Sequence, residues 1–230
     1  ERDFTFYPGS FNMKLQMSSS AALDALADPT TRIANRVTIR EGIRIEEVLS
    51  AIAQKTGINL GTLESASKDL ATLGIPATEV SAEGWLFPAT YEFDPELSAQ
   101  QVLKIMVDRM KTELDRYGVS VADRHKVLTL ASIVENEVNS PDDYYKASRV
   151  FTNRLEVGMP LQSDATVSYG VRGSTFTTSK ADRADPNPYN TYKYPGLPIG
   201  PIGAPGSLAI DAAVNPIAGD WLYFVTVNLK

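Results

Sequence analysis

Two glutamates, Glu135 and Glu137, lie near the end of a helix predicted over residues 123–138. When residues are placed about 100° apart around the helix axis, apolar side chains fill an arc of roughly 220°. The arc consists of Val127, Leu128, Leu130, Ala131, Ile133, Val134 and Val138. Both glutamates fall among these residues, where a purely structural helix would carry hydrophobic side chains. The pattern therefore predicts a largely buried helix with two carboxyl groups in unusual positions.

Burial and the negative end of a helix dipole both disfavour an ionised carboxylate, so both raise a carboxyl pKa. An acid that keeps its proton near neutral pH can protonate the oxygen of a glycosidic bond. Glu135 and Glu137 lie about 160° apart around the helix, so only one of them can face a given substrate. The structural alternative is that these acids extend into solvent or pair with Arg149 or Arg154. We expect Glu137 to be a structural acid paired with a basic neighbour, and His125 to be a surface or capping residue.

The elements that must position these acids predict an α+β fold in two parts. Residues 1–80 have the pattern of a small α+β module, and residues 81–230 are mainly helical with a few short strands. In chain order we expect a strand at 4–7, a helix at 18–27, a strand at 36–40, helices at 45–55, 98–117, 123–138, 140–157, 164–169 and 207–215, and a strand at 221–227. The proline-rich segment 185–206 is expected to be an ordered loop, because it is too apolar for a solvated linker.

The composition excludes several classes of chemistry. The chain has 230 residues, 43% of them hydrophobic, which is enough for a sizeable core. Its 22 Lys and Arg residues against 28 Asp and Glu residues give a net charge of -6, which disfavours nucleic acid as a partner. There is no cysteine and a single histidine, so we expect no disulfide, no thiol catalysis, no metal site and no cofactor. The available chemistry is that of carboxylates and hydroxyls.

The sequence also bears on membrane attachment. The longest uncharged run, 194–210, is interrupted by four prolines, so we expect no membrane-spanning helix in this chain. The chain opens at Glu1 and stops inside the apolar run 221–227. We therefore expect it to be a processed or excised piece whose signal or anchor has been removed.

Four blocks in order resemble the MltG (YceG-like) family of endolytic murein transglycosylases. The blocks are EGWLFPATY at 83–91, LASIVENE at 130–137, VFTNRLEVGMPLQSDATVSYG at 150–170, and PYNTY at 188–192 with GLPIGPI at 196–202. The resemblance covers residues 83 to 225, and residues 1–80 resemble the family's LysM-like part loosely. It implies a LysM-like module at 1–80 and a C-terminally truncated YceG-like catalytic domain at 81–230.

The resemblance further implies a bacterial lyase that cuts nascent peptidoglycan glycan strands internally. The cut bond would join N-acetylmuramic acid to N-acetylglucosamine and would leave 1,6-anhydro-N-acetylmuramic acid ends. Glu135 matches the family's catalytic glutamate and would act first as general acid and then as base. The family is anchored by one N-terminal helix in the cytoplasmic membrane, which this chain lacks, with its catalytic part outside. A peptidoglycan synthase complex is the implied partner.

Polar and aromatic residues after the third central helix are candidates for contacts with the sugars. Hydroxyl, amide and carboxyl groups can hydrogen-bond to sugars, and tyrosine rings offer flat apolar faces. The candidates are Asn153, Gln162, Ser163, Asp164, Thr166, Tyr169, Tyr189, Asn190, Thr191 and Tyr192. The alternative for each is a structural role, such as capping the short helix at 164–169 or packing in the core.

Three other functions are compatible with the same residues. A muramidase-type hydrolase would use the same glutamate with water, and the products would differ from those of a lyase. A non-catalytic glycan-binding or scaffold protein would bind without Glu135. A regulator of a synthesis complex would have no use for two acids in an apolar arc, and we rank it last.

Overall fold

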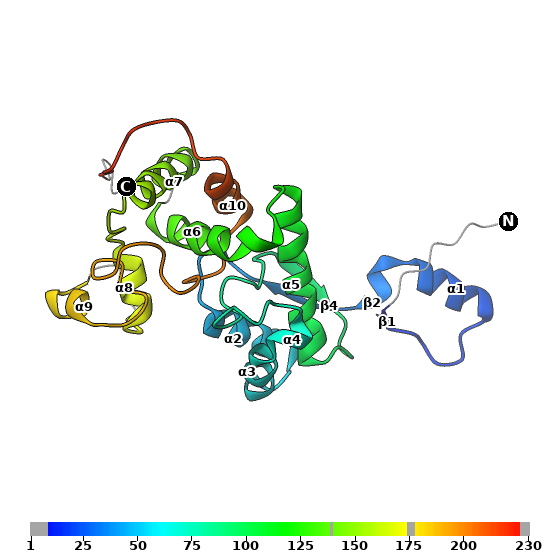
Figure 1. The fold of residues 1–230 in the computed structure, drawn as a ribbon. Coiled ribbons are helices and arrows are strands. Elements are labelled where there is room, and N and C mark those ends of the chain that lie inside the picture. The colour runs from blue at the N-terminus through cyan, green and yellow to red at the C-terminus, as the bar shows by residue number, and fades with distance from the viewer. Residues whose placement is uncertain (1–8, 139, 174–177, 226–230) are drawn as a thin grey trace.

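The computed structural model describes residues 9–138, 140–173 and 178–225, and these form a mainly helical α+β fold (Figure 1). Its elements in chain order are β1 (Ser10–Phe11), α1 (Ser19–Ala27), the 3-10 helix η1 (Pro29–Thr31), β2 (Arg32–Ile33), β3 (Asn35–Thr38), α2 (Ile45–Thr56), α3 (Leu60–Lys68), α4 (Leu70–Leu73), β4 (Thr90–Phe93), α5 (Ala99–Arg116), the 3-10 helix η2 (Val121–Asp123), α6 (Arg124–Glu137), α7 (Pro141–Glu156), α8 (Asp164–Gly170), α9 (Lys180–Ala184) and α10 (Ser207–Val214). The predicted fold class is confirmed.

The two sheets are small, and both are antiparallel pairs. β1 pairs with β2, and β3 pairs with β4 in a register that places Val37 opposite Tyr91. The second pair joins strands from either side of residue 80, and both Val37 and Phe93 belong to one core that extends to Ala212. The LysM-like and catalytic parts expected from the sequence therefore share a sheet and a core, and the boundary between them stays a prediction.

The segment from β1 to β2 lies apart from the rest of the molecule, at the right of Figure 1. Ser10 connects this segment to the rest of the molecule. Its backbone N–H and its hydroxyl donate to the two carboxylate oxygens of Asp94 at 2.7 and 2.9 Å. None of the side chains in α1 is buried. The cleft described below is thus built by the residues after β2.

Helix α6 runs through the middle of the helical part and packs against α7, α8 and α10. Every residue from Leu128 to Val134 is buried. Thr129 and Ser132, which the helical projection places outside the apolar arc, are buried because their hydroxyls find backbone partners. Thr129 donates to the carbonyl of His125 at 2.7 Å, and the Ser132 hydroxyl accepts the Ile202 N–H at 3.0 Å.

Most predicted helices are present with their predicted ends. Ser98 caps α5 by accepting the Gln101 N–H, Pro141 begins α7, and Gly57 ends α2 with a φ of 76°. The proline-rich loop is ordered as predicted, since Asn190, Thr191 and Ile202 are buried in it.

Other expectations differ from the structure. The predicted terminal strand is wrong over residues 221–225, which are irregular, and its last residues lie outside the described part. In this segment Arg154 donates to the carbonyl of Leu222, so a side chain, and not a neighbouring strand, provides the hydrogen-bond partner of that carbonyl. The strand expected at 4–7 also lies outside the described residues. The elements that the sequence does not predict include α3, α4, α9, β1, β2 and β4. Within the described residues, no helix combines the length and apolar character needed to cross a bilayer.

Candidate active site

Glu135 lies on a cleft of about 970 Å³ where three distant parts of the chain meet. The turn before α2, the end of α6 with the start of α7, and the region of α8 each form one side of it. The lining residues are Arg40, Glu41, Gly42, Ile43, Arg44, Glu46, Glu47, Glu135, Asn136, Val138, Tyr144, Ala165, Ser168, Tyr169, Arg172, Gly173 and Ile202. The residue that the sequence singled out therefore has the groove that it would need.

Both carboxylate oxygens of Glu135 have a hydrogen-bond donor. The hydroxyl of Tyr144, on the second turn of α7, donates to Oε1 at 2.7 Å, and the Gly206 N–H donates to Oε2 at 3.0 Å. The arginines considered as partners are directed elsewhere: Arg149 donates to the carbonyls of Pro216 and Ile217, and Arg154 to those of Leu161 and Leu222. Glu135 is thus held in place by neutral donors and remains at the cleft.

The turn at residues 41–43 is joined to the loop before α10 by two backbone hydrogen bonds. Gly42 N–H donates to Ala204 O at 2.8 Å, and Ala204 N–H donates to Ile43 O at 2.9 Å. The approach is so close that a Cβ on Gly203 would lie 2.6 Å from the Gly42 carbonyl oxygen. Gly42 itself has a φ of 75°, which favours glycine. Small residues on both segments therefore allow this part of the cleft to form.

Glu41 projects from that turn next to Glu135. A Cβ added to Gly206 would collide with the Glu41 carboxylate, so this carboxylate lies directly against the glycine whose N–H holds Glu135. Partial burial raises the pKa of Glu41, and the negative charge of Glu135 raises it further. The cleft therefore contains two neighbouring carboxyl groups, from segments 94 residues apart in numbering (135 less 41).

Tyr169 forms the α8 side of the cleft, and Arg44 packs against its ring. The Arg44 guanidinium carbon lies 5.1 Å from the centre of the Tyr169 ring, and Nη2 donates to Gly173 O at 2.9 Å. Tyr189 contacts the same ring, with 4.7 Å between ring centres. The Tyr169 hydroxyl donates to Glu83, which is 1% exposed, at 3.1 Å. Burial raises the pKa of Glu83 to about 7 against the opposing effect of hydrogen bonds from Ile45 and Tyr169.

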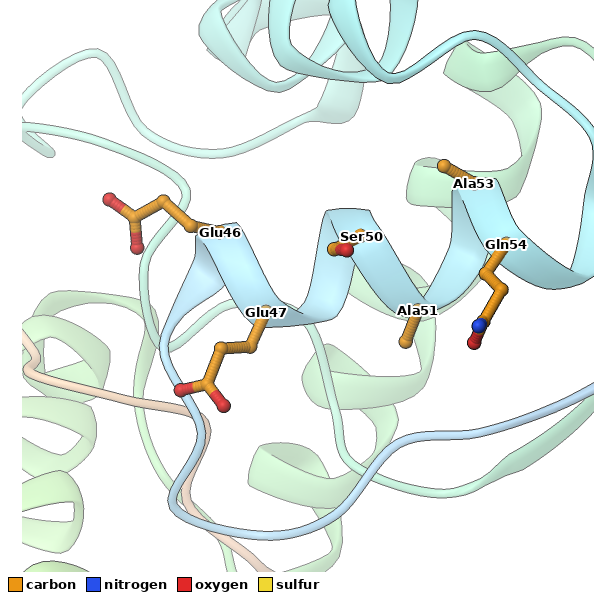
Figure 2. A pocket seen from close by; sticks show the side chains of 6 residues that line it. All are labelled: Glu46, Glu47, Ser50, Ala51, Ala53 and Gln54. Carbon is orange, nitrogen blue, oxygen red and sulfur yellow. The ribbon is translucent and has the colours of Figure 1, made fainter.

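A second, shallower hollow follows the outer surface of α2 (Figure 2). It is lined by Glu46, Glu47, Ser50, Ala51, Ala53 and Gln54, none of which is buried. Glu46 and Glu47, at the start of the helix, belong to both hollows. Because this hollow is lined by α2 alone, whereas the cleft at Glu135 is formed by three segments of the chain, we place the site in the cleft.

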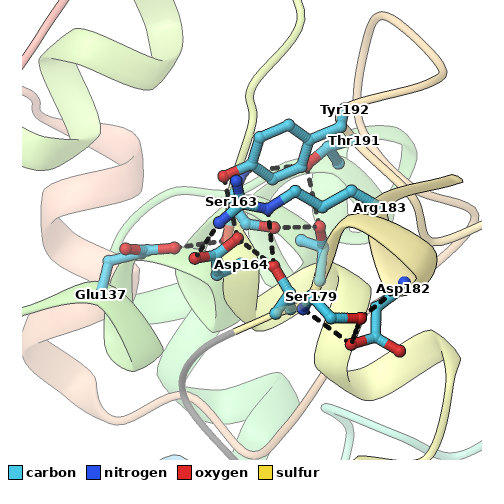
Figure 3. A network of polar contacts seen from close by, with 10 residues as sticks. Glu137, Ser163, Asp164, Ser179, Asp182, Arg183, Thr191 and Tyr192 are labelled. Atoms are coloured by element: carbon cyan, nitrogen blue, oxygen red, sulfur yellow. Dashed lines mark hydrogen bonds and ion pairs between the residues drawn. The ribbon is translucent and has the colours of Figure 1, made fainter.

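Glu137 lies in different surroundings, within a network of polar side chains (Figure 3). Its carboxylate accepts a hydrogen bond from the Ser163 hydroxyl. Burial raises the pKa of Glu137, although the bond from Ser163 and the nearby charge of Arg154 oppose this effect. The expected basic neighbour is therefore present as a nearby charge, and the hydrogen bonds to the carboxylate come from the Ser163 hydroxyl and the Ala165 N–H.

The other predicted polar residues surround Glu137 rather than Glu135. Thr191 accepts the Ser163 N–H at 3.0 Å, and its hydroxyl pairs with that of Thr166 at 2.8 Å. Asp164 accepts hydrogen bonds from Tyr192 at 2.8 Å and from Arg183 at 3.1 Å. Ser163, Thr166 and Thr191 are at most 2% exposed. The network therefore joins α8, α9 and the loop after it, with Ser163, Thr166 and Thr191 as its buried part.

The remaining candidates are also away from the cleft. The Asn190 amide donates to the carbonyls of Arg183 and Asp185, and the Asn153 amide to those of Gly219 and Trp221. Gln162 is exposed, with a φ of 54°. Of the ten candidates, Tyr169 lines the cleft and Tyr189 packs behind it. Contacts of the whole set with a substrate stay predictions.

Sequence reasoning missed Glu41, Arg44, Glu83 and Tyr144. A signal was available for Glu83, because it opens the EGWLFPATY block and is a charged residue in front of an apolar run. Glu41 precedes a glycine just before a helix, which is also typical of an ordinary polar turn. Tyr144 carries no local signal, since its contact with Glu135 depends on how α6 and α7 cross.

Comparison with known proteins shows the family of the chain. Residues 1–230 match the YceG-like family. A Bacillus subtilis protein named endolytic murein transglycosylase is 33% identical over 243 residues, which cover 96% of this chain and 67% of the relative. A protein of the same name from Streptococcus pneumoniae is 29% identical over 252 residues, covering 94% of this chain and 46% of that protein.

A solved structure is also similar. The crystal structure of a YceG-like protein from Listeria monocytogenes superimposes with a TM-score of 0.74 and 29% sequence identity, covering 92% of this chain and 77% of that chain. The family match spans the whole sequence, and the fold and the relatives agree with it. This chain belongs to the YceG-like family.

Proposed function

We propose that this protein is a peptidoglycan lytic transglycosylase that cleaves glycan strands internally, with Glu135 as its catalytic acid and base. The observation that carries the proposal is the position of Glu135 on a cleft of about 970 Å³, with Tyr144 and Gly206 fixing its two oxygens. The names of the Bacillus subtilis and Streptococcus pneumoniae relatives support the same reaction class. The substrate is the nascent strand of alternating N-acetylglucosamine and N-acetylmuramic acid.

The reaction needs one side chain in two steps. Protonated Glu135 donates its proton to the oxygen that links N-acetylmuramic acid to N-acetylglucosamine, and the bond to the muramyl anomeric carbon breaks with its electron pair leaving on that oxygen. The Glu135 carboxylate then takes the proton of the muramyl C6 hydroxyl, whose oxygen bonds to the anomeric carbon. The acetamido group of the sugar can stabilise the positive charge at that carbon. The products are a free N-acetylglucosamine end and a 1,6-anhydro-N-acetylmuramic acid end, and no water is consumed.

The neighbours of Glu135 suit this exchange of protons. Tyr144 and Gly206 hold the carboxyl group in one orientation, which reduces the motion needed between donation and abstraction. Because neither donor is a cation, the carboxyl group is not locked in an ion pair. The buried network around Glu137 keeps α8 against the end of α6 and so supports the wall that carries Tyr169.

Hydrolysis by the same cleft is the second candidate, and one observation favours it. Glu41 lies close enough to Glu135 for the charge of Glu135 to raise the pKa of Glu41. Glycoside hydrolases place a second carboxylate near the acid, as a base or nucleophile. In that reaction Glu41 would activate a water molecule, and the muramyl product would be heavier than the anhydro form by one water.

The cellular setting of the proposal follows from its substrate. Nascent glycan strands lie outside the cytoplasmic membrane, so the catalytic part acts on the periplasmic or wall side. A membrane anchor preceding this chain, a LysM-like role for residues 1–80 and association with a peptidoglycan synthase complex complete the proposal. A non-catalytic glycan-binding protein is the alternative in which binding survives both loss of Glu135 and deletion of residues 81–230.

Mass spectrometry of the fragments released from purified peptidoglycan identifies the bond that is cut and the kind of end that is left. Applied to variants, it also tests whether Glu135 is needed. We expect anhydro-muramyl ends from the native chain and none from Glu135→Gln, while Glu137→Gln provides the matched control on the same helix. Reducing muramyl ends would instead assign the hydrolase. Binding of glycan without release of any fragment would assign the non-catalytic alternative.

A further inference from the structure

Glu83 is a buried carboxyl group that the proposed reaction does not use. It is 1% exposed and lies in the segment between α4 and β4. One of its oxygens, Oε2, accepts two hydrogen bonds from different parts of the cleft wall. The Ile45 N–H, at the first residue of α2, donates at 3.1 Å, and the Tyr169 hydroxyl, on α8, donates at 3.1 Å.

Both of these donors lead to Arg44. Ile45 is the next residue along the backbone, so its hydrogen bond fixes the point from which the Arg44 side chain extends. The Tyr169 ring is the surface against which the guanidinium packs, at 5.1 Å from its centre. The guanidinium is also held by the Gly173 carbonyl at 2.9 Å and lines the cleft that contains Glu135. A single oxygen atom of Glu83 therefore fixes both the backbone origin and the aromatic support of one cation in the cleft.

We propose that Glu83 is a positioning residue for Arg44, and that Arg44 binds an acceptor oxygen of the glycan substrate. A guanidinium has five N–H donors in a planar arrangement, so after its bond to Gly173 it has donors left for a ligand. The acceptor is a carbonyl or carboxylate oxygen, supplied by a sugar acetamido group or by the peptide attached to muramic acid. This inference rests on the proposed function, because it requires that the cleft bind a glycan.

The ionisation of Glu83 gives the arrangement a signature that simple packing would lack. Its pKa lies at about 7, and an ionised carboxylate accepts hydrogen bonds more strongly than a neutral one. Glycan binding should therefore tighten as the pH rises through neutrality. The titratable groups coupled to Glu83 are Glu46 on α2, Tyr169 on α8 and Tyr189 in the following loop. Glu41, in the cleft, titrates in the native and variant proteins alike.

The test measures glycan affinity in the full chain carrying Glu135→Gln, so that no substrate is consumed. The probe is a peptidoglycan tetrasaccharide with its stem peptides, and a second sample has the peptides removed. We expect Arg44→Gln, Glu83→Gln and Tyr169→Phe each to weaken binding, Glu83→Gln by about five- to tenfold, as is typical of coupled neighbours. Tyr169→Phe keeps the ring and removes the hydroxyl, and with it the bonds to Glu83 and Tyr189, so it remains informative if Glu83→Gln folds poorly.

The decisive measurement is the combination of variants. If Glu83 acts through Arg44, then Glu83→Gln adds no further loss to Arg44→Gln, and it abolishes the change of affinity through neutral pH. Glu79→Gln is the matched control, because Glu79 is a buried carboxyl group bound to His125 outside the cleft, and it should leave affinity unchanged. A loss that persists for the peptide-free probe assigns the acetamido group, and a loss confined to the intact probe assigns the peptide carboxylate.

Two results would overturn the inference. One is a native glycan affinity in Glu83→Gln and Tyr169→Phe. The other is a loss of affinity from Glu83→Gln that adds in full to the loss from Arg44→Gln when the two are combined. Failure of the proposed function is distinguishable. A protein that takes no glycan would leave the parent chain unable to bind either tetrasaccharide, and one that binds glycan without cleaving it is identified by the fragments that the native chain fails to release.

Discussion

Glu135 and Glu137 are two residues apart on α6, yet they lie in opposite kinds of surroundings. Glu135 is held by a tyrosine hydroxyl and a backbone N–H at the edge of an open cleft. Glu137 is bound to Ser163 inside a network that is rich in polar side chains. The difference shows that the polar network around Glu137 supports the fold, whereas the acid on the cleft is held by two hydrogen bonds.

The largest effect should come from replacing the acid at the cleft. Glu135→Gln keeps the shape of the side chain and removes the proton, so we expect the rate of glycan cleavage to fall by about 10²- to 10⁴-fold. The melting temperature should change little, because the amide oxygen can still accept one of the two hydrogen bonds. Release of soluble fragments measures the rate, and calorimetry measures the stability. A variant with native activity would remove Glu135 from the reaction.

Glu83 is a third carboxyl group to compare with these two, and it is almost completely buried. The pKa of Glu83 is raised from 4.5 to about 7, so between these values the folded state binds more protons than the unfolded state. The stabilising contribution is complete below about pH 4.5 and is lost as the pH rises through about 7. We expect native stability to fall by about 3 kcal/mol relative to Glu83→Gln across this interval. Denaturant unfolding at several pH values measures it, and a constant difference would contradict the prediction.

Replacing Glu137 should lower the stability of the fold and leave cleavage nearly unchanged, which is the reverse of the result expected for Glu135. Glu137→Leu leaves the buried Ser163 hydroxyl without its acceptor, so we expect a loss of about 1–3 kcal/mol in the free energy of unfolding. Cleavage at low temperature, where the variant is folded, should stay within a few-fold of native. Ser163→Ala tests the same bond from its other end. If Glu137→Leu abolished cleavage while remaining stable, the contrast between the two acids would be wrong.

The smallest expected effect tests the contact between the two carboxyl groups of the cleft. Gly206→Ala has no backbone strain, because the φ of Gly206 is -82°. Its methyl group would nevertheless displace the Glu41 carboxylate and disturb the N–H that binds Glu135. We expect about a fivefold loss of kcat/KM, or about 1 kcal/mol, with stability nearly unchanged. Adding Glu41→Ala removes the collision, so the kcat/KM of the double variant should be no lower than that of Glu41→Ala alone.

Local signals in the sequence predicted much of the helical part. Ser98 and Pro141 mark helix starts, Gly57 and Gly118 mark ends, and each of them does so in the structure. These signals act through neighbouring residues, so they can be read without the rest of the fold. β4 was missed because its pairing with β3 joins Thr38 to Thr90 across 52 positions. The short helix α4, of four residues, offers too few turns for a period to be visible.

The candidate site was predictable in part for the same reason. The apolar arc is a property of one helix, and it singled out Glu135 and Glu137 together, while the family resemblance chose Glu135 between them. The position of Arg44 or Glu41 beside that acid depends on contacts between distant segments, which no periodicity records. Ser163 and Thr191 were candidates because of their residue type. The sequence does not distinguish a buried hydroxyl that pairs with a neighbouring side chain from one that binds a ligand.

The pair of backbone bonds between Gly42 and Ala204 and between Ala204 and Ile43 has a consequence for when the enzyme gains its activity. During synthesis, the turn that carries Glu41 is made long before the loop that supplies Gly206. Until both have been made and have met, Glu135 lacks one of its two anchors and the cleft lacks a side. An incomplete chain that ends before residue 206 therefore lacks the N–H that holds the second oxygen of Glu135, so the proposed catalytic acid reaches its described position only after this loop has been made.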